Sequence, residues 1–398
     1  MSEVRARPLP LAAFWFGLQF VWGALLAVSL QSRSETLAPQ SAVWAYALIA
    51  AVGAIVATIV QLLVGPLSDR SRERAGTRIA FYRTGVVLAV PAIIWFYLAP
   101  NYTNLVAAFF LVQVAMNIAT GPYQAVIPDY VAPDAAGAAS SRMSVFQSLG
   151  NAGGLLAAGF IADVRVVAAL LVATLVGSYA ITARHIARLP ARRVRAIGVR
   201  VGPAFRTLLA SRGAINLGFY TLLGFLFFYV RQSLGVSDVR TQTALLFLTF
   251  TLCGVAGALL GARPADRFDK RAVVMAANTL VVIALGTLVL AHTLPVAYAA
   301  AALAGIAWGA YFTADWALAC TLLPREAMGA AMGVWNIASS VPQIAAPLIA
   351  APLVERINTL SPGNGPRAAI ALAILEFTIG AVWLYRLPAI APTGEPLA

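Results

Sequence analysis

Apolar stretches long enough to cross a bilayer recur along almost the whole chain. A helix needs about 20 mostly apolar residues to span about 30 Å of hydrocarbon. Backbone groups in lipid must be satisfied internally, which leaves only helices and closed barrels. Barrel strands would be about half as long and would alternate polar with apolar residues. The sequence therefore predicts an all-α membrane protein with twelve transmembrane helices, at 11–30, 42–66, 79–98, 103–126, 144–162, 164–184, 213–234, 241–262, 272–292, 295–317, 329–353 and 367–386.

Composition agrees with lipid as the solvent of this chain. Hydrophobic residues make up 61% of the 398 positions and charged residues 11%, whereas a soluble domain has about 25% charged residues. A soluble enzyme is therefore not expected. The net charge of +13 would suggest a nucleic-acid partner for a soluble protein. Here it reflects which loops face the cytoplasm, so we expect the lipid bilayer as partner and no nucleic acid.

The distribution of basic residues predicts the orientation in the membrane. With both termini inside, the cytoplasmic segments hold 22 of the 28 Lys and Arg residues. An excess of Lys and Arg marks cytoplasmic loops. We therefore expect a multi-pass protein of the inner membrane with both termini in the cytoplasm.

The longest polar connection separates two halves of similar length. Residues 185–212 contain seven arginines and two prolines between the sixth and seventh predicted helices. This segment is interpreted as a cytoplasmic linker between an N-terminal six-helix bundle, 1–184, and a C-terminal six-helix bundle, 213–398.

Two loop motifs recur at nearly the same offset in the two halves. Gly65-Pro-Leu-Ser-Asp69-Arg70 follows the second helix, and Gly261-Ala-Arg-Pro-Ala-Asp266-Arg267 follows the eighth; the two aspartates are 197 residues apart. Pro133-Asp-Ala-Ala-Gly137 and Pro324-Arg-Glu-Ala-Met-Gly329 follow the fourth and tenth helices, and their glycines are 192 residues apart. Such a recurrence indicates a duplicated six-helix unit.

These motifs resemble the loop signature of the major facilitator superfamily. Arg72 and Asp269 stand where the signature has its second glycine. The resemblance implies two six-helix bundles related by a pseudo-two-fold axis and working by alternating access. It also implies that the loops are gating latches, and solvated loop charges are the alternative. The gating residues so implied are Asp69, Arg70, Arg74, Asp266 and Arg267.

Two shorter segments indicate which branch of the superfamily the chain resembles. Residues 125–133 and 335–343 resemble the sucrose-transporter and glycoside–cation symporter branch, which implies sugar import coupled to H⁺ or Na⁺. Drug/proton antiporters usually carry an Arg on the fourth helix and a Gly-Pro motif on the fifth. This chain offers Gln113, Asn117 and Gln124 on the former, and Gly150-Asn151-Ala-Gly153-Gly154 without proline on the latter.

Polar side chains in predicted spans form stripes at helical spacing. Intramembrane polar residues are costly and therefore candidates for function. Amides donate to and accept from hydroxyl groups, and aromatic rings cover the apolar face of a sugar. The alternative is that the amides bond between helices. The predicted substrate-binding residues are Gln19, Gln113, Asn117, Tyr123, Gln147, Asn151, Tyr220, Trp308, Tyr311, Asn336 and Gln343.

Two carboxyl groups lie within predicted spans. Asp315 shares a helical face with Trp308 and Tyr311. It is predicted to bind and release a proton; pairing with Arg325 or capping a helix is the alternative. Glu376 lies in the middle of the twelfth helix and is a second candidate for proton coupling, unless it is simply protonated or paired.

One further pair of charged residues lies at the turn between the fourth and fifth predicted helices. Asp129 and Arg142 flank this turn and are candidates for a gating ion pair, with solvated charges as the alternative.

The sequence contains no motif for nucleotide binding, nucleophilic catalysis or metal binding. There is no Gly-x4-Gly-Lys-Ser/Thr loop for ATP, no Ser/His/Asp arrangement and no His/Cys cluster with metal spacing. We therefore expect no cofactor, no metal and no enzyme activity. The preferred function is H⁺-coupled import of a sugar or glycoside by a monomer. Efflux of a drug or hydrophobic metabolite is the first alternative, and a non-transporting sensor or scramblase the second.

Overall fold

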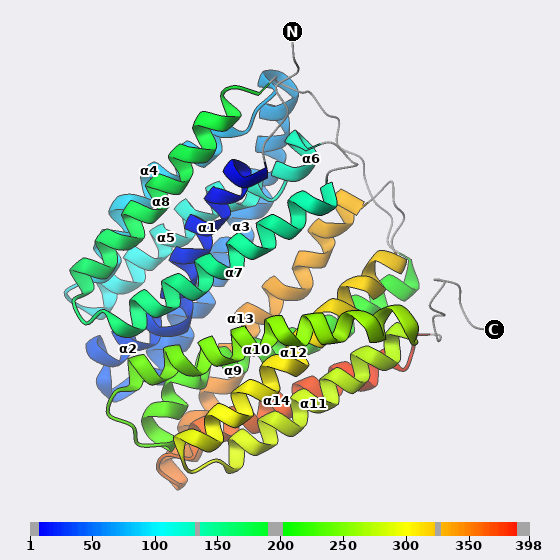
Figure 1. Cartoon of the computed structure of the whole chain (residues 1–398). Coiled ribbons are helices and arrows are strands. Elements are labelled where there is room, and N and C mark those ends of the chain that lie inside the picture. The colour runs from blue at the N-terminus through cyan, green and yellow to red at the C-terminus, as the bar shows by residue number, and fades with distance from the viewer. Residues whose placement is uncertain (1–7, 132–135, 190–201, 323–327, 388–398) are drawn as a thin grey trace. The chain divides into compact units, whose positions relative to one another are not determined.

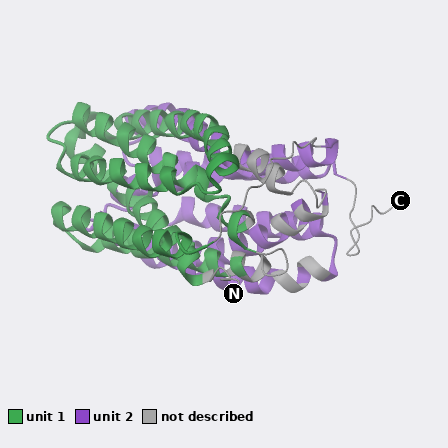
Figure 2. Cartoon of the chain, turned by 90° about the horizontal axis from the view of Figure 1, so that it is seen from above, with its two compact units in different colours: residues 1–196 green, residues 197–398 purple. Residues whose placement is uncertain are grey.

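The computed structural model describes residues 8–131, 136–189, 202–322 and 328–387. The chain divides into two compact units, Met1–Ala196 and Ile197–Ala398 (Figure 2).

The N-terminal unit is built from helices (Figure 1). The first span bends through a π-helical turn, and a 3₁₀ turn leads into the second. In chain order the elements are α1 (Pro8–Ala24), η1 (Leu25–Ser29), α2 (Leu30–Leu37), η2 (Pro39–Ser41), α3 (Ala42–Ala75), α4 (Ile79–Leu98), α5 (Tyr102–Tyr123), α6 (Val126–Tyr130), α7 (Ala136–Phe160) and α8 (Val164–Ile186).

The C-terminal unit repeats this plan, with a π-helical turn at the end of its first helix. Its elements are α9 (Pro203–Phe228), η4 (Tyr229–Ser233), α10 (Val239–Arg267), α11 (Lys270–Leu290), α12 (Leu294–Leu322), α13 (Met328–Leu360) and α14 (Gly365–Leu384).

The packing pattern is the same in the two units. In the first, α1 packs on α7 and α8, α5 on α3 and α4, and α4 on α8. In the second, α9 packs on α13 and α14, α12 on α10 and α11, and α11 on α14. The duplication inferred from the loop motifs thus extends to the order in which helices contact one another.

The predicted all-α membrane architecture of twelve helices is confirmed. Within the described residues, ten helical segments are long and apolar enough to cross a membrane. The other two predicted spans correspond to the long helices α7 and α13.

Local sequence fixes several helix ends. Gly76 ends α3 with φ +71°, a left-handed conformation that glycine adopts without steric cost. The side chains of Asn101, Asp163 and Asp269 each accept a hydrogen bond from a backbone N–H in the first turn of the next helix, which satisfies a donor that the helix leaves free.

Several helix boundaries differ from expectation: α7 begins at Ala136 and not at 144, and α13 ends at Leu360 and not at 353. α9 begins at Pro203, not at 213, because proline is well suited to the first turn of a helix. α3 continues to Ala75, so the motif from Gly65 to Arg74 is helical and not a loop. Pro66 is accommodated inside this helix.

Candidate functional sites

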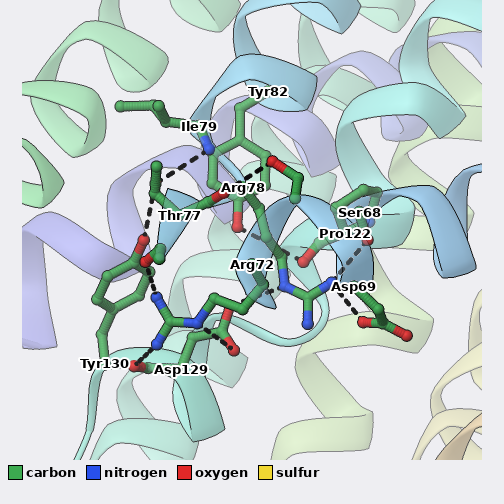
Figure 3. Close-up of polar contacts among 12 residues, drawn as sticks. Ser68, Asp69, Arg72, Thr77, Arg78, Ile79, Tyr82, Pro122, Asp129 and Tyr130 are labelled. Atoms are coloured by element: carbon green, nitrogen blue, oxygen red, sulfur yellow. Dashed lines mark hydrogen bonds and ion pairs between the residues drawn. The ribbon is translucent and has the colours of Figure 1, made fainter. Parts of the chain in front are cut away.

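A cluster of charged side chains, most of them buried, joins α3, α4 and α6 in the N-terminal unit (Figure 3). Arg78 stands just before α4. Its Nε donates to Asp129 Oδ2 at 2.8 Å, and its Nη1 lies 2.6 Å from both Asp69 Oδ1 and Ser68 Oγ. A planar guanidinium can hold two carboxylates in this way, whereas an ammonium is a point charge. We name Ser68, Asp69, Arg72, Arg78 and Asp129 the Arg78 cluster.

Arg72 forms the second half of the Arg78 cluster. Its Nη2 donates to the backbone carbonyl of Asp129 at 2.7 Å, its Nη1 donates to the carbonyl of Gly76, and its Nε lies 3.5 Å from Asp129 Oδ1. The guanidinium carbon also lies 5.1 Å from the ring centroid of Tyr130. Arg72 therefore ties the end of α3 to α6 through backbone and side chain together.

Charge balance keeps the Arg78 cluster ionic. Burial lowers the pKa of Arg78, but the carboxylates of Asp129 and Asp69 outweigh it and hold that pKa above its ordinary value. Arg72 and Asp129 are 1% and 5% exposed. Since both partners are desolvated, loss of either one would leave an uncompensated buried charge.

The predicted gating residues are placed differently from one another. Asp69 belongs to the Arg78 cluster, while Arg70 and Arg74 are exposed. Arg267 is exposed as well, and the Asp266 side chain lies outside the described part of the chain. The expected pairing of Asp129 with Arg142 is wrong: Asp129 binds Arg72 and Arg78, and Arg142 is exposed.

Sequence reasoning missed the roles of Arg72 and Arg78. The loop signature gives Arg72 only as a residue at the position of its second glycine, and it does not include Arg78. Their partner, Asp129, is 57 and 51 residues away. The one sequence signal was that both arginines lie close to Asp69 of the motif. This signal does not identify Asp129 as their partner.

A second buried ion pair lies in the C-terminal unit. Arg212 Nη1 on α9 donates to Asp315 Oδ2 on α12, and the two residues are 8% and 1% exposed. Tyr311, one turn before Asp315, is buried beside it and interacts with both members. The Arg212 guanidinium carbon also lies 5.9 Å from the ring centroid of Phe312. Arg212 is thus a partner of Asp315 among the described residues, and Arg325, the alternative partner, lies outside them.

Aromatic rings continue from the Arg212–Asp315 pair along α12. Trp308 stacks on Phe219 of α9, with centroids 4.5 Å apart and planes 13° apart. It also contacts Tyr311 at 5.1 Å and meets Phe377 of α14 edge-on at 6.2 Å. The predicted face of Trp308, Tyr311 and Asp315 is thus one connected surface within the unit.

Several predicted substrate-binding side chains bond within the protein. Asn117 accepts a hydrogen bond from Gln61 at 2.7 Å and donates to Gln113 at 3.1 Å. Tyr123 donates to the carbonyl of Leu11. These three predicted residues, Gln113, Asn117 and Tyr123, are buried, so their polar groups hold helices together in this conformation.

The remaining predicted residues are more accessible. Gln19, Gln147 and Asn151 of the N-terminal unit are half-buried, as are Tyr220, Trp308 and Gln343 of the C-terminal unit. The Asn336 side chain lies outside the described part of the chain. Asn216, on α9, donates to the carbonyl of Ala338 at 2.9 Å and so joins α9 to α13.

An apolar cavity lies between α9, α10, α11 and α12. Its volume is about 40 Å³, and its lining consists of apolar side chains, among them Phe219, Leu223, Phe250 and Leu285. Within the described residues, no group of three or more His, Cys, Asp or Glu side chains could hold a metal ion.

Comparisons with known proteins agree with the helix plan. A sequence profile of the Major Facilitator Superfamily matches residues 11–347. A bacterial homologue of the human lysosomal transporter Spinster, in an inward-facing and occupied conformation, superposes with a TM-score of 0.72 at 14% identity over 95% of both chains.

A second solved structure has the same fold. A bacterial homologue of the iron transporter ferroportin, in an inward-facing state, superposes with a TM-score of 0.65 at 14% identity, over 94% of this chain and 98% of its own. At such identities these likenesses show the fold alone.

Proposed function

Because this chain belongs to the major facilitator superfamily, we propose that it is a secondary active transporter whose coupling ion is the proton. The single observation that carries proton coupling is the Arg212–Asp315 pair, buried between two membrane-spanning helices. Ionisable residues in membrane spans are costly and mark ion and substrate pathways. Because a carboxylate can take up a proton, such a pair has two states, one with Asp315 ionised and one with Asp315 protonated.

The two states differ in which group neutralises Asp315. When Asp315 is ionised, Arg212 binds it and α9 is tied to α12. When Asp315 is protonated, the ionic part of this bond is lost, and Arg212 can turn to a hydroxyl group or an anion of the substrate. Alternating access needs such a bistable element, biased by both ligands.

We further propose that the substrate is a sugar or glycoside and that transport is import. The half-buried amides Gln19, Gln147, Asn151 and Gln343 support this, since amides match the mixed donors and acceptors of hydroxyl groups. Trp308 supplies an aromatic face in the same unit as Gln343.

The test is uptake of labelled sugars into proteoliposomes under an imposed inward proton gradient. We compare the wild type with Asp315→Asn, and use Arg206→Gln as a matched control because Arg206 is an exposed arginine on α9. Gradient-driven accumulation of one sugar, lost in Asp315→Asn while sugar exchange remains, supports the proposal. Accumulation that survives in Asp315→Asn would rule out this residue as the coupling site.

Efflux of a hydrophobic compound is the second candidate. The wholly apolar cavity between α9, α10, α11 and α12 favours it, because binding sites for such compounds are lined mainly by apolar side chains. Hydrophobic cations that drive proton release from proteoliposomes, with no sugar transported, would establish efflux in place of import.

A further inference from the structure

Glu376 is a buried carboxyl group that the coupling pair does not use. It lies in the middle of α14 and is 4% exposed. Within the described part of the chain neither of its carboxyl oxygens has a hydrogen-bond partner of ordinary geometry. The polar group that interacts with it is the hydroxyl of Thr221 on α9. Thr221 is itself fully buried, and its hydroxyl has no other partner among the described residues.

The seam between α9 and α14 is closely packed on both sides of Glu376. A Cβ atom added to Gly218 would lie 2.6 Å from the Phe377 ring, and one added to Gly380 would lie 2.5 Å from Ile215. The Ser211 hydroxyl donates to the carbonyl of Gly380 at 2.7 Å. The unpartnered oxygens therefore do not result from loose helix contact, and the seam has little room for a hydrated ion.

Cationic side chains on the helices packed against α14 are engaged elsewhere or lie near helix ends. On α9, Arg212 is bonded to Asp315. Lys270 and Arg271 begin α11, and Arg356 is near the end of α13, beside Glu355. Tyr220 precedes Thr221 and is half-buried. None of these is an interaction partner of Glu376 within the described residues.

A metal cation is a poor fit for this place. Hard cations such as Ca²⁺ and Mg²⁺ take about six or more oxygen ligands, and Glu376 with Thr221 offers a carboxylate and one hydroxyl. An unpaired buried carboxylate is so costly that it neutralises instead. Protonation satisfies both residues, since the acid O–H can donate to the Thr221 hydroxyl oxygen.

We propose that Glu376 carries a proton at neutral pH and forms with Thr221 a second proton-binding site, separate from the Arg212–Asp315 pair. Both sites include a residue of α9, Arg212 and Thr221, which are about 13 Å apart along the axis at 1.5 Å per residue. α9 ends in the π-helical turn η4, and such turns are frequent at functional sites. A shift of α9 would therefore alter both proton sites together. This last step rests on the proposed proton-coupled function.

Infrared spectroscopy of the full-length protein in lipid tests the site without any substrate. In the difference between wild type and Glu376→Gln at neutral pH, we expect loss of a carboxylic-acid C=O band, which disappears from the wild type at alkaline pH. Thr221→Val keeps the shape and removes the hydroxyl, so the band should remain but move to higher frequency. Asp315→Asn should leave it in place. A wild type with no such acid band at neutral pH would overturn the proposal, as would a band that Thr221→Val does not move.

Transport then tests the coupling step separately. For any sugar that the wild type accumulates, Glu376→Gln should lower the accumulation ratio at a fixed proton gradient and keep exchange. An unchanged ratio would exclude Glu376 from coupling. If no sugar is transported, the proposed substrate fails, and the infrared result still decides whether Glu376 holds a proton.

Discussion

The Nε atom of Arg78 lies 2.8 Å from Oδ2 of Asp129, and this bond joins the start of α4 to the short helix α6. Asp129 also forms an ion pair with Arg72, so one carboxylate contacts two guanidinium groups. Asp69 supplies the second carboxylate to Arg78 from α3. Three helices of the N-terminal unit therefore depend on one buried acid.

Asp129→Asn should destabilise the N-terminal unit. Asparagine keeps the shape but removes the negative charge between Arg72 and Arg78, at a cost of about 3–5 kcal/mol for a buried ion pair that loses one partner. Thermal unfolding in detergent micelles measures the change in melting temperature. Glu73→Gln is the matched control, because Glu73 is an exposed carboxylate on α3; equal shifts for the two variants would contradict the importance of the Arg78 cluster.

A double-mutant cycle on Arg212 and Asp315 should show strong coupling. Arg212→Gln and Asp315→Asn each leave one buried charge alone, which costs about 3–5 kcal/mol. The double variant removes both charges and should recover much of that loss. Denaturation in micelles measures the free energy of unfolding of the two single variants and the double variant, each relative to the wild type. Additive losses would mean that the two side chains do not interact as they do in the structure.

Gly309→Ala should loosen the contact between α10 and α12. An added Cβ would lie 1.9 Å from the backbone carbonyl oxygen of Gly254, and overpacking of this kind costs about 1–3 kcal/mol. Gly286→Ala, in α11, is the control because no atom lies within 4 Å of its added Cβ. That control should be neutral or slightly stabilising, since alanine favours helix. Unfolding temperatures of the two variants give the comparison.

Single cysteines should report the orientation of the helices. In a background with Cys253 and Cys320 replaced by alanine, Glu73→Cys is expected inside and Ala162→Cys outside; both positions are exposed. A membrane-impermeant thiol reagent added to intact cells should label position 162 and spare position 73 until the membrane is opened. The reverse pattern would overturn the predicted cytoplasmic termini.

The length and hydropathy of the apolar stretches predicted the number of long helices and the positions of most of them. The fourth predicted span, 103–126, corresponds to Tyr102–Tyr123, and the third, 79–98, corresponds to Ile79–Leu98. Length and hydropathy set these spans because lipid imposes one thickness on every crossing. The duplicated motifs likewise indicated two similar halves, since a repeated sequence repeats its local preferences.

Only the tertiary structure decided the partners of the charged side chains. Helical periodicity places Asp315 on one face of α12, but Arg212 lies 103 residues away, on a stretch expected to be linker and found to be helix. Asp129 was matched to Arg142, its neighbour in sequence, while α3 and the start of α4 brought Arg72 and Arg78 to it. The reason is physical: the period of a helix fixes which residues share a face, whereas packing between helices fixes which faces meet.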